Sequence, residues 1–229
     1  MSALKDEQVD DILYAGRAGD IDALKESLAE IDGGGDAAFH LALGCTNESG
    51  NSLLHFAFAN GHEDLIHYVL PYCDLAALLR QNEAGNTPLH WAAFNGHMKL
   101  CELLIDRIDA LETQDEASAH QLRAEEDKRE HERHLAANKK TGEPEAEQKA
   151  ELEHHDELQR DRALWDIRNA AGHGPMTEAQ KADREDIVQM MLGRLAQHDK
   201  SDPPPDPQDE ATHIEERTNQ LRLDVDPSV

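Results

Sequence analysis

The sequence predicts an all-α solenoid of about four helix–turn–helix repeats, with a charged insertion before the last repeat and an acidic tail after it. Three observations support this prediction. Residues 47–70 and 82–105 are identical at 11 of 24 aligned positions. Each of these copies begins with a glycine-containing turn and continues as two short apolar stretches of helical period. The remaining sequence holds long polar segments whose composition is typical of solvated helix or disorder, not of a core.

The turn and helix start of the second copy explain the repeat in physical terms. Gly85 stands where a tight turn requires a positive φ angle. Thr87 is placed to cap the following helix, and Pro88 is suited to its first position. His90 is placed to hydrogen-bond backbone across the turn. An Asn-Gly pair at 95–96 supplies a left-handed helix end. The Thr-Pro-Leu-His signature identifies these segments as ankyrin repeats.

Two weaker copies flank the central pair. Residues 14–28 fit the helix pair 42 residues before the copy at 47–70, and Gly33-Gly34-Gly35 then reads as a flexible connection. Downstream, Asn169 follows Asn82 by 87 residues, where a single period would be about 33. The residues between Asn82 and Asn169 in excess of one period are about as many as the residues of the charged stretch. We therefore predict repeats one to three in 1–111, a charged insertion (helical or disordered) in 112–163, a last capping repeat in 164–198, and a Pro-rich linker with an acidic tail in 199–229.

The charge indicates the kind of partner. The chain has 48 acidic and 22 basic residues, a net charge of −26, and the four segments carry −12, −7, −1 and −6. This balance argues against direct nucleic-acid binding, which needs clustered Lys and Arg, and favours a basic partner. A soluble acidic protein without a basic partner remains the alternative. There is no run of 18 apolar residues, so we expect no membrane span. The opening residues contain no apolar signal segment, and three scattered cysteines favour a reducing compartment.

Motifs for catalysis, cofactors and metals are weak, so we expect no enzyme and no cofactor. His131 and His134 are three residues apart and lack the spacing of a zinc protease. The glycines at 33–35 are not followed by the Lys-Ser/Thr of a phosphate loop. A metal-responsive protein that uses the histidines of the insertion, including His154 and His155, is a third alternative.

One column of the repeat alignment predicts a recognition face. The position after the signature histidine is Phe56 in one copy and Trp91 in the next, and the same offset in the first copy gives Tyr14. An aromatic row on the first helices, edged by acids at the turn tips, suits an amphipathic basic segment. The alternative is that these rings pack between neighbouring first helices. The predicted partner-binding residues are Tyr14, Arg17, Glu48, Asn51, Phe56, Glu83, Asn86, Trp91, Phe94 and Asn95.

Several segments together resemble a specific group of ankyrin proteins. The resemblance covers roughly 1–111 and 164–223, and the insertion departs from the compact pattern of that group. The residues that carry the resemblance are the opening Asp11 to Lys25, Gly85 to Ala92 with Asn95-Gly96, Ile167-Arg168-Asn169 with Gly172-His173, and the acidic end from Glu210 to Leu221. In these segments the chain resembles the small fungal ankyrin-repeat chaperones of ribosomal protein S-three of the small subunit.

The resemblance implies a dedicated chaperone. Such a protein, expected to be a monomer, would keep a newly made basic ribosomal protein soluble, travel with it from cytoplasm to nucleus and aid assembly of the small subunit. The alternative from another class is a generic ankyrin adaptor in signalling or transcription. In that case the same face would recruit a non-ribosomal partner, and the insertion and tail would be independent binding motifs.

Overall fold

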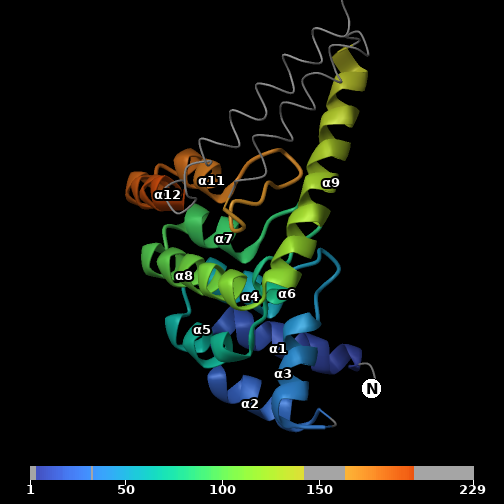
Figure 1. Ribbon diagram of the computed structural model, residues 1–229. Helices are drawn as coiled ribbons and strands as arrows, with labels where there is room; N and C mark the ends of the chain where they lie inside the picture. The colour runs from blue at the N-terminus through green and yellow to red at the C-terminus, as the bar shows by residue number, and fades with distance from the viewer. Residues whose placement is uncertain (1–3, 32, 142–162, 199–229) are drawn as a thin grey trace, which may run out of the picture. The chain divides into compact units, whose positions relative to one another are not determined.

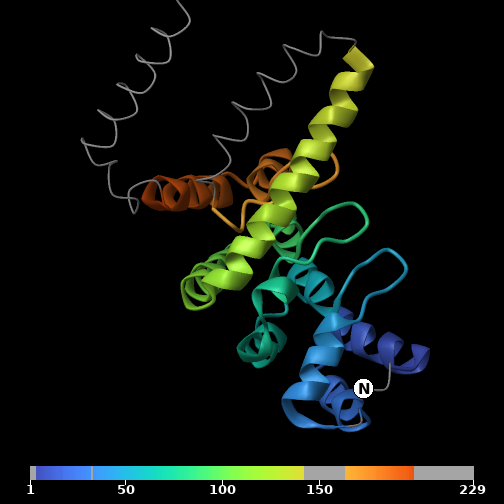
Figure 2. The ribbon, with the colours of Figure 1, turned by 45° about the vertical axis from the view of Figure 1, so that its right-hand side comes forward.

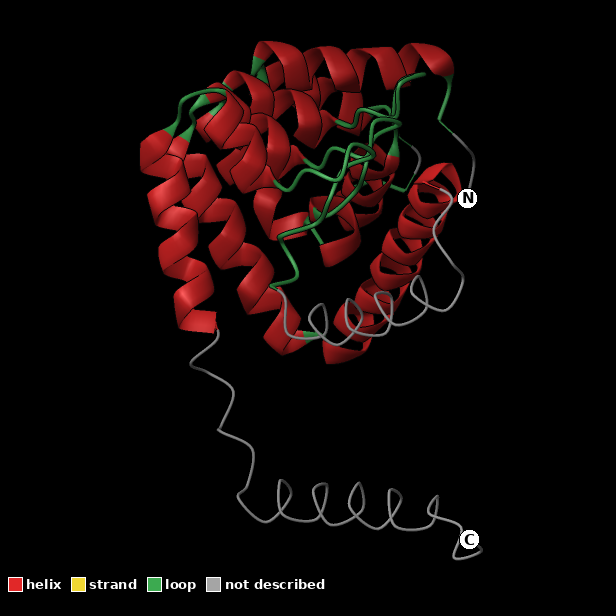
Figure 3. Ribbon diagram, turned by 90° about the horizontal axis from the view of Figure 1, so that it is seen from above, coloured by secondary structure: helices red, strands yellow, loops and turns green. Residues whose placement is uncertain are grey.

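The computed structural model describes residues 4–31, 33–141 and 163–198, and within these ranges every regular element is a helix (Figure 1; Figure 3). No helix in these ranges combines the length and the apolar character needed to cross a membrane. The described residues up to Leu192 belong to one compact unit. The elements are α1 (Asp6–Ala18), α2 (Ile21–Ala29), α3 (Gly35–Gly44), α4 (Leu53–Asn60), α5 (Glu63–Val69), the 3₁₀-helix η1 (Leu70–Tyr72), α6 (Leu75–Leu78), α7 (Pro88–Asn95), α8 (Met98–Gln114), α9 (Glu116–Thr141), α11 (Pro175–Lys181) and α12 (Glu185–His198).

The helices form a row of antiparallel pairs, which confirms the predicted all-α solenoid. The pairs are α1–α2, α4–α5, α7–α8 and α11–α12. Their first helices pack in series, α1 against α4, α4 against α7, and α7 against α11 (Figure 2). The core lies between successive pairs, where Leu54, Phe58, Leu65 and Leu104 are fully buried. Burial of these side chains is the main contribution that holds each repeat to the next.

The helix ends agree with the sequence prediction in the two central repeats. Thr87 caps α7, and Pro88 is its first residue. Gly61 and Gly96 end α4 and α7 with φ angles of 76° and 86°. The last repeat reaches the same left-handed conformation without glycine, because Asp183 takes a φ of 55° at the position that corresponds to Gly96. Aspartate tolerates this region better than most side chains.

A buried histidine joins each central first helix to the next turn. Nδ1 of His55 accepts a hydrogen bond from the backbone N–H of Ser52 (3.1 Å), and Nε2 donates to the carbonyl of Asn86 (2.9 Å). His90 makes the equivalent bonds to Thr87 (3.1 Å) and His173 (3.0 Å). Burial lowers the pKa of both imidazoles from 6.5 to about 4. Both rings are therefore neutral and carry their proton on Nε2.

The three turns at 47–51, 82–86 and 169–173, named fingers one, two and three, stack in register. Asn82 Nδ2 donates to Asn51 Oδ1 and Asn169 Nδ2 donates to Asn86 Oδ1, each at 2.8 Å. Backbone bonds of 3.0 Å run beside them, from Glu83 N to Ser49 O and from Ala170 N to Ala84 O. The fingers therefore lie side by side as a continuous ladder (Figure 3).

Two parts of the chain differ from the sequence interpretation. The flexible connection expected at 33–35 leads at once into α3, which begins at Gly35. This helix buries Phe39, whose ring stacks on Tyr72 with centroids 3.7 Å apart. This helix was not predicted, because the apolar residues of α3 follow the glycine run without a side chain that caps the helix.

The second difference concerns the charged insertion. Residues 116–141 form α9, which begins beside α6 and α8 and extends beyond them (Figure 1; Figure 2). The expectation that the insertion at 112–163 stays out of packed structure was wrong for four of its described residues, since Ala119, Glu126, Glu130 and Ala163 are buried. An ion pair between Arg123 and Glu112 joins α9 to α8. Residues 142–162 and the predicted linker and tail at 199–229 lie outside the described residues.

The thiols of Cys45, Cys73 and Cys101 are all free. Cys73 and Cys101 are buried, and burial raises the pKa of each to about 12. Both side chains therefore act as small apolar groups of the core.

Packing between fingers predicts unequal effects of two glycine substitutions. Gly85 and Gly172 have φ angles of 75° and 79°, so alanine costs each about 1 kcal/mol of backbone strain. A Cβ on Gly85 would lie 2.6 Å from Ala170 N, whereas one on Gly172 would meet nothing within 4 Å. We expect Gly85→Ala to destabilise the protein by roughly 1–3 kcal/mol more than Gly172→Ala in urea unfolding. Equal losses would show that the fingers do not pack tightly.

The buried histidines predict acid sensitivity. Their folded pKa values lie below the unfolded value, so the unfolded state binds more protons and stability is complete only above about pH 6.5. Stability then falls as the pH drops toward about 4. We expect each histidine to contribute a loss of roughly 2 kcal/mol between about pH 7 and about pH 5, measured by urea unfolding. His55→Asn should give a shallower pH dependence than the wild type, because it removes one of the two buried imidazoles. An unaltered slope in His55→Asn would contradict this account.

Candidate functional site

The predicted recognition residues lie on consecutive first helices and on the tips of fingers one and two. The surface made of these two tips and the solvent-accessible side chains of the first helices α1, α4, α7 and α11 is named the partner face. Its aromatic side chains differ in exposure. Tyr14 is 62% exposed and Phe94 is 43% exposed, whereas Phe56 and Trp91 are half-buried. Tyr14 and Phe94 thus offer the largest free apolar surface of the four rings.

Arg17 links two of the predicted residues. Its guanidinium carbon lies 4.5 Å from the centre of the Phe56 ring, in cation–π geometry. The contact joins α1 to α4 and covers part of the Phe56 ring. A ligand on this side therefore meets Arg17 before it meets Phe56, and Tyr14 one turn away remains open to solvent.

The acidic tip residues are free, while the neighbouring asparagines are occupied. Glu48 and Glu83 are exposed on adjacent fingers, and neither makes an ion pair with any described residue. Asn51 and Asn86 belong to the finger ladder, and Asn95 Nδ2 donates to Ala59 O at 3.0 Å. The two carboxylates are therefore available to a cationic partner, and the three amides already stabilise the stack.

Sequence reasoning missed the residues that end the partner face in the last repeat. Glu178 occupies the position of Trp91, and Lys181 occupies the position of Phe94. Glu178 accepts hydrogen bonds from Asn169 (3.1 Å) and Lys181 (3.2 Å), and His173 Nδ1 lies 3.2 Å from the same oxygen. The aromatic row thus gives way to a polar cluster. The offset of 87 residues, applied to the aromatic column, would have identified both residues.

The electrostatics of Glu178 keep this end of the face charged. Burial alone would raise the pKa of its carboxyl group. Hydrogen bonds from Lys181 and Asn169, together with the charges of Lys181 and His173, outweigh burial and hold the pKa of Glu178 below its ordinary value. Glu178 is therefore an internally paired carboxylate, in contrast to Glu48 and Glu83.

The histidine motifs considered for metal binding show no constellation in the described part of the chain. No group of three or more His, Cys, Asp or Glu side chains able to hold a metal ion occurs there. His154 and His155 lie outside the described residues.

Comparisons with known proteins agree with this geometry. The family described as ankyrin repeats, three copies, matches residues 12–115. A curated ankyrin repeat-containing protein of Schizosaccharomyces pombe is 46% identical over 98 residues, which are 43% of this chain and 62% of that protein. This chain therefore spans about three fifths of the length of that relative.

A similar solved structure is one chain of the crystal structure of yeast ribosomal protein Rps3 in complex with its chaperone Yar1. The two chains superpose with a TM-score of 0.53 at 24% identity, covering 89% of this chain and 99% of that chain. At this level of identity the likeness concerns the fold.

The repeat signature, the serial packing of the first helices and the finger ladder all describe one architecture, and its exposed face is suited to protein interaction. Residues 12–115 match the ankyrin-repeat family, and the described residues together form an all-α solenoid of helix pairs.

Proposed function

We propose that this protein is a chaperone that binds a newly synthesised, basic ribosomal protein of the small subunit, of the S-three type, and keeps it soluble for nuclear delivery and ribosome assembly. The observation that carries the proposal is a partner face that combines exposed aromatic rings with unpaired carboxylates, on a chain of net charge −26. The fold similarity to a chain of the Rps3–Yar1 complex supports it.

The partner face suggests how a client is held. Tyr14 and Phe94 act as apolar anchors, because they lose the most water-exposed surface when a segment docks. Glu48 and Glu83, one repeat apart, pair with client Lys or Arg side chains at the rim. An amphipathic segment with basic residues along one edge can contact the two rings with its apolar side chains and the two carboxylates with its basic side chains. Half-buried Trp91 on α7 and exposed Arg17 on α1 belong to the same face.

The acidity of the chain acts at longer range. A ribosomal protein is basic because it must meet RNA, and an acidic binder attracts it and competes with premature RNA contacts. Residues 1–111, which include most of the partner face, carry a net charge of −12. No catalytic step is needed for this role, since holding and releasing a client requires binding alone. We propose that the protein acts as a monomer in cytoplasm and nucleus, and that the client supplies the import signal.

Substitution of the exposed anchors tests the proposal. Tyr14→Ala with Phe94→Ala should weaken binding of the purified S-three-type ribosomal protein by about 10-fold or more, measured by isothermal titration calorimetry. The melting temperature should change little, because both side chains are largely exposed. Leu192→Ala is the matched control, since Leu192 is 44% exposed on the last helix, outside the partner face. An unchanged affinity of the double variant, or a collapse of its melting transition, would contradict the assignment of these anchors.

Salt dependence and co-purification separate the chaperone from a generic adaptor. Affinity should fall steeply between about 50 mM and about 500 mM salt, because exposed ion pairs are screened. A pulldown with the full chain should recover one stoichiometric small-subunit ribosomal protein without ribosomal RNA. Recovery of regulatory complexes instead would favour the adaptor, and a spread of basic proteins that wash off with salt would indicate unspecific attraction.

A further inference from the structure

Finger three occupies an open end of the ladder. Finger two is packed between its neighbours, and a Cβ on Gly85 would lie 2.6 Å from the backbone of finger three. A Cβ added at the equivalent position of finger three, Gly172, would meet no atom of the described residues within 4 Å. Finger three therefore lacks the support that a following finger would give it.

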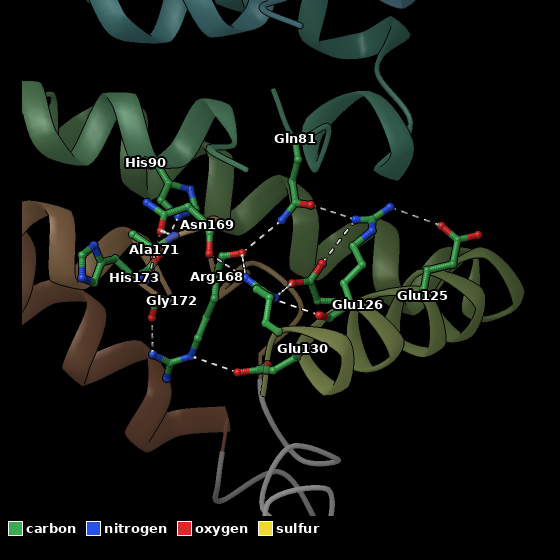
Figure 4. A network of polar contacts seen from close by, with 12 residues as sticks. Gln81, His90, Glu125, Glu126, Glu130, Arg168, Asn169, Ala171, Gly172 and His173 are labelled. Atoms are coloured by element: carbon green, nitrogen blue, oxygen red, sulfur yellow. Dashed lines mark hydrogen bonds and ion pairs between the residues drawn. The ribbon is translucent and has the colours of Figure 1, made fainter. Parts of the chain in front are cut away.

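Helix α9 supports finger three from its base. Arg133 Nη1 donates to the carbonyl oxygens of Arg168 and Asn169, each at 2.6 Å (Figure 4). Gln81 Nε2 donates to the same Arg168 carbonyl at 3.2 Å, and Arg129 Nη1 holds the Gln81 side chain through its Oε1 at 2.9 Å. Among the hydrogen bonds of the described residues, no arginine reaches the backbone of finger one or finger two.

Two buried carboxylates hold the arginines in position. Glu126 pairs with Arg133 at 2.7 Å and with Arg129 at 3.3 Å, and its side chain is 9% exposed. Glu130, 7% exposed, lies 3.5 Å from Arg168, whose Nη1 donates to Gly172 O at 3.1 Å. A buried carboxylate that loses its cation is strongly unfavourable, so each acid restricts its arginine to one orientation. This set of residues on α9, namely Glu126, Arg129, Glu130 and Arg133, is named the brace.

Asn169 connects the brace to the partner face. Its carbonyl oxygen receives Arg133, and its side-chain amide donates to Asn86 Oδ1 (2.8 Å) and to Glu178 Oε1 (3.1 Å). Its Oδ1 accepts the backbone N–H groups of Ala171 and His173, both at 3.0 Å. A shift of the Asn169 backbone would therefore move finger three and the Glu178 cluster together.

We propose that the brace positions finger three, and that loss of the brace loosens finger three and the polar end of the partner face while the first two fingers stay in place. Arg133 is then a positioning residue for the partner face, and α9 supports the last repeat of the solenoid. The binding role of the partner face rests on the proposed function. The contacts of the brace exist in the free protein and do not depend on a client.

Amide hydrogen exchange of the free protein, followed by NMR, tests the proposal. In Arg133→Gln, the amides of Ala170 and Gly172 should exchange about 10-fold faster or more than in the wild type, because their hydrogen bonds open when finger three moves. Gly50 in finger one should keep its rate. Lys128→Gln is the matched control, since Lys128 is exposed on α9 and makes no hydrogen bond or ion pair with the described residues. Glu126→Gln, which removes the carboxylate that orients Arg133, should reproduce the effect.

Two outcomes would overturn the brace. Unchanged exchange in finger three of both variants would show that α9 does not position it. An equal acceleration in fingers one and three would show general loss of stability instead. The exchange experiment involves no client, so a failure of the chaperone proposal leaves its result standing, and a failure of the brace leaves anchoring at Tyr14 and Phe94 untouched.

Discussion

The solenoid depends on an imidazole that donates its single proton across a repeat boundary. His55 holds the start of α4 through Nδ1 and reaches the backbone of finger two through Nε2, and His90 does the same between α7 and finger three. Each ring thereby accepts an N–H at a helix N-terminus and donates to a finger carbonyl that also accepts a backbone N–H within its own finger, from Asn82 or from Asn169. The hydroxyl oxygens of the cap residues Ser52 and Thr87 also lie 2.9 Å from Nδ1 of His55 and His90.

The cap residue and the histidine of each central repeat lie close together in sequence, so the central repeats could be predicted from sequence. Helices α3 and α9 have no such local pattern and could not be predicted in the same way. Thr87, Pro88 and His90 have local roles, so their spacing is visible in one copy and repeated in the next. Helix α3 and helix α9 have no such signature. Phe39 is buried by contact with Tyr72, a residue far along the chain, and Glu126 is buried because arginines neutralise it. Neither long-range stacking nor ion pairing leaves a periodic apolar pattern.

The candidate site was predictable to a similar extent. Alignment of the repeats placed Tyr14, Phe56 and Trp91 on neighbouring helices, as the structure does. It gave no information on exposure, which depends on what covers each ring, such as Arg17 over Phe56. It also could not separate a tip carboxylate from a ladder amide, because both residue types suit turns. Glu48 is open to solvent, and Asn51, three residues on, is hydrogen-bonded to the next finger.

The position of the charged segment also affects how the chain folds during synthesis. The bonds that dock the last repeat, from Asn169 to Asn86 and from His90 to His173, join residues 83 apart in sequence. The bonds between fingers one and two span only 31 residues. At a translation rate of about 5–20 residues per second, the side of α7 that receives α11 stays uncovered for on the order of 10 s. The nascent chain thus passes through a three-repeat stage with an apolar end, and completion of the solenoid is a late, long-range closure instead of the stepwise growth expected of an uninterrupted array.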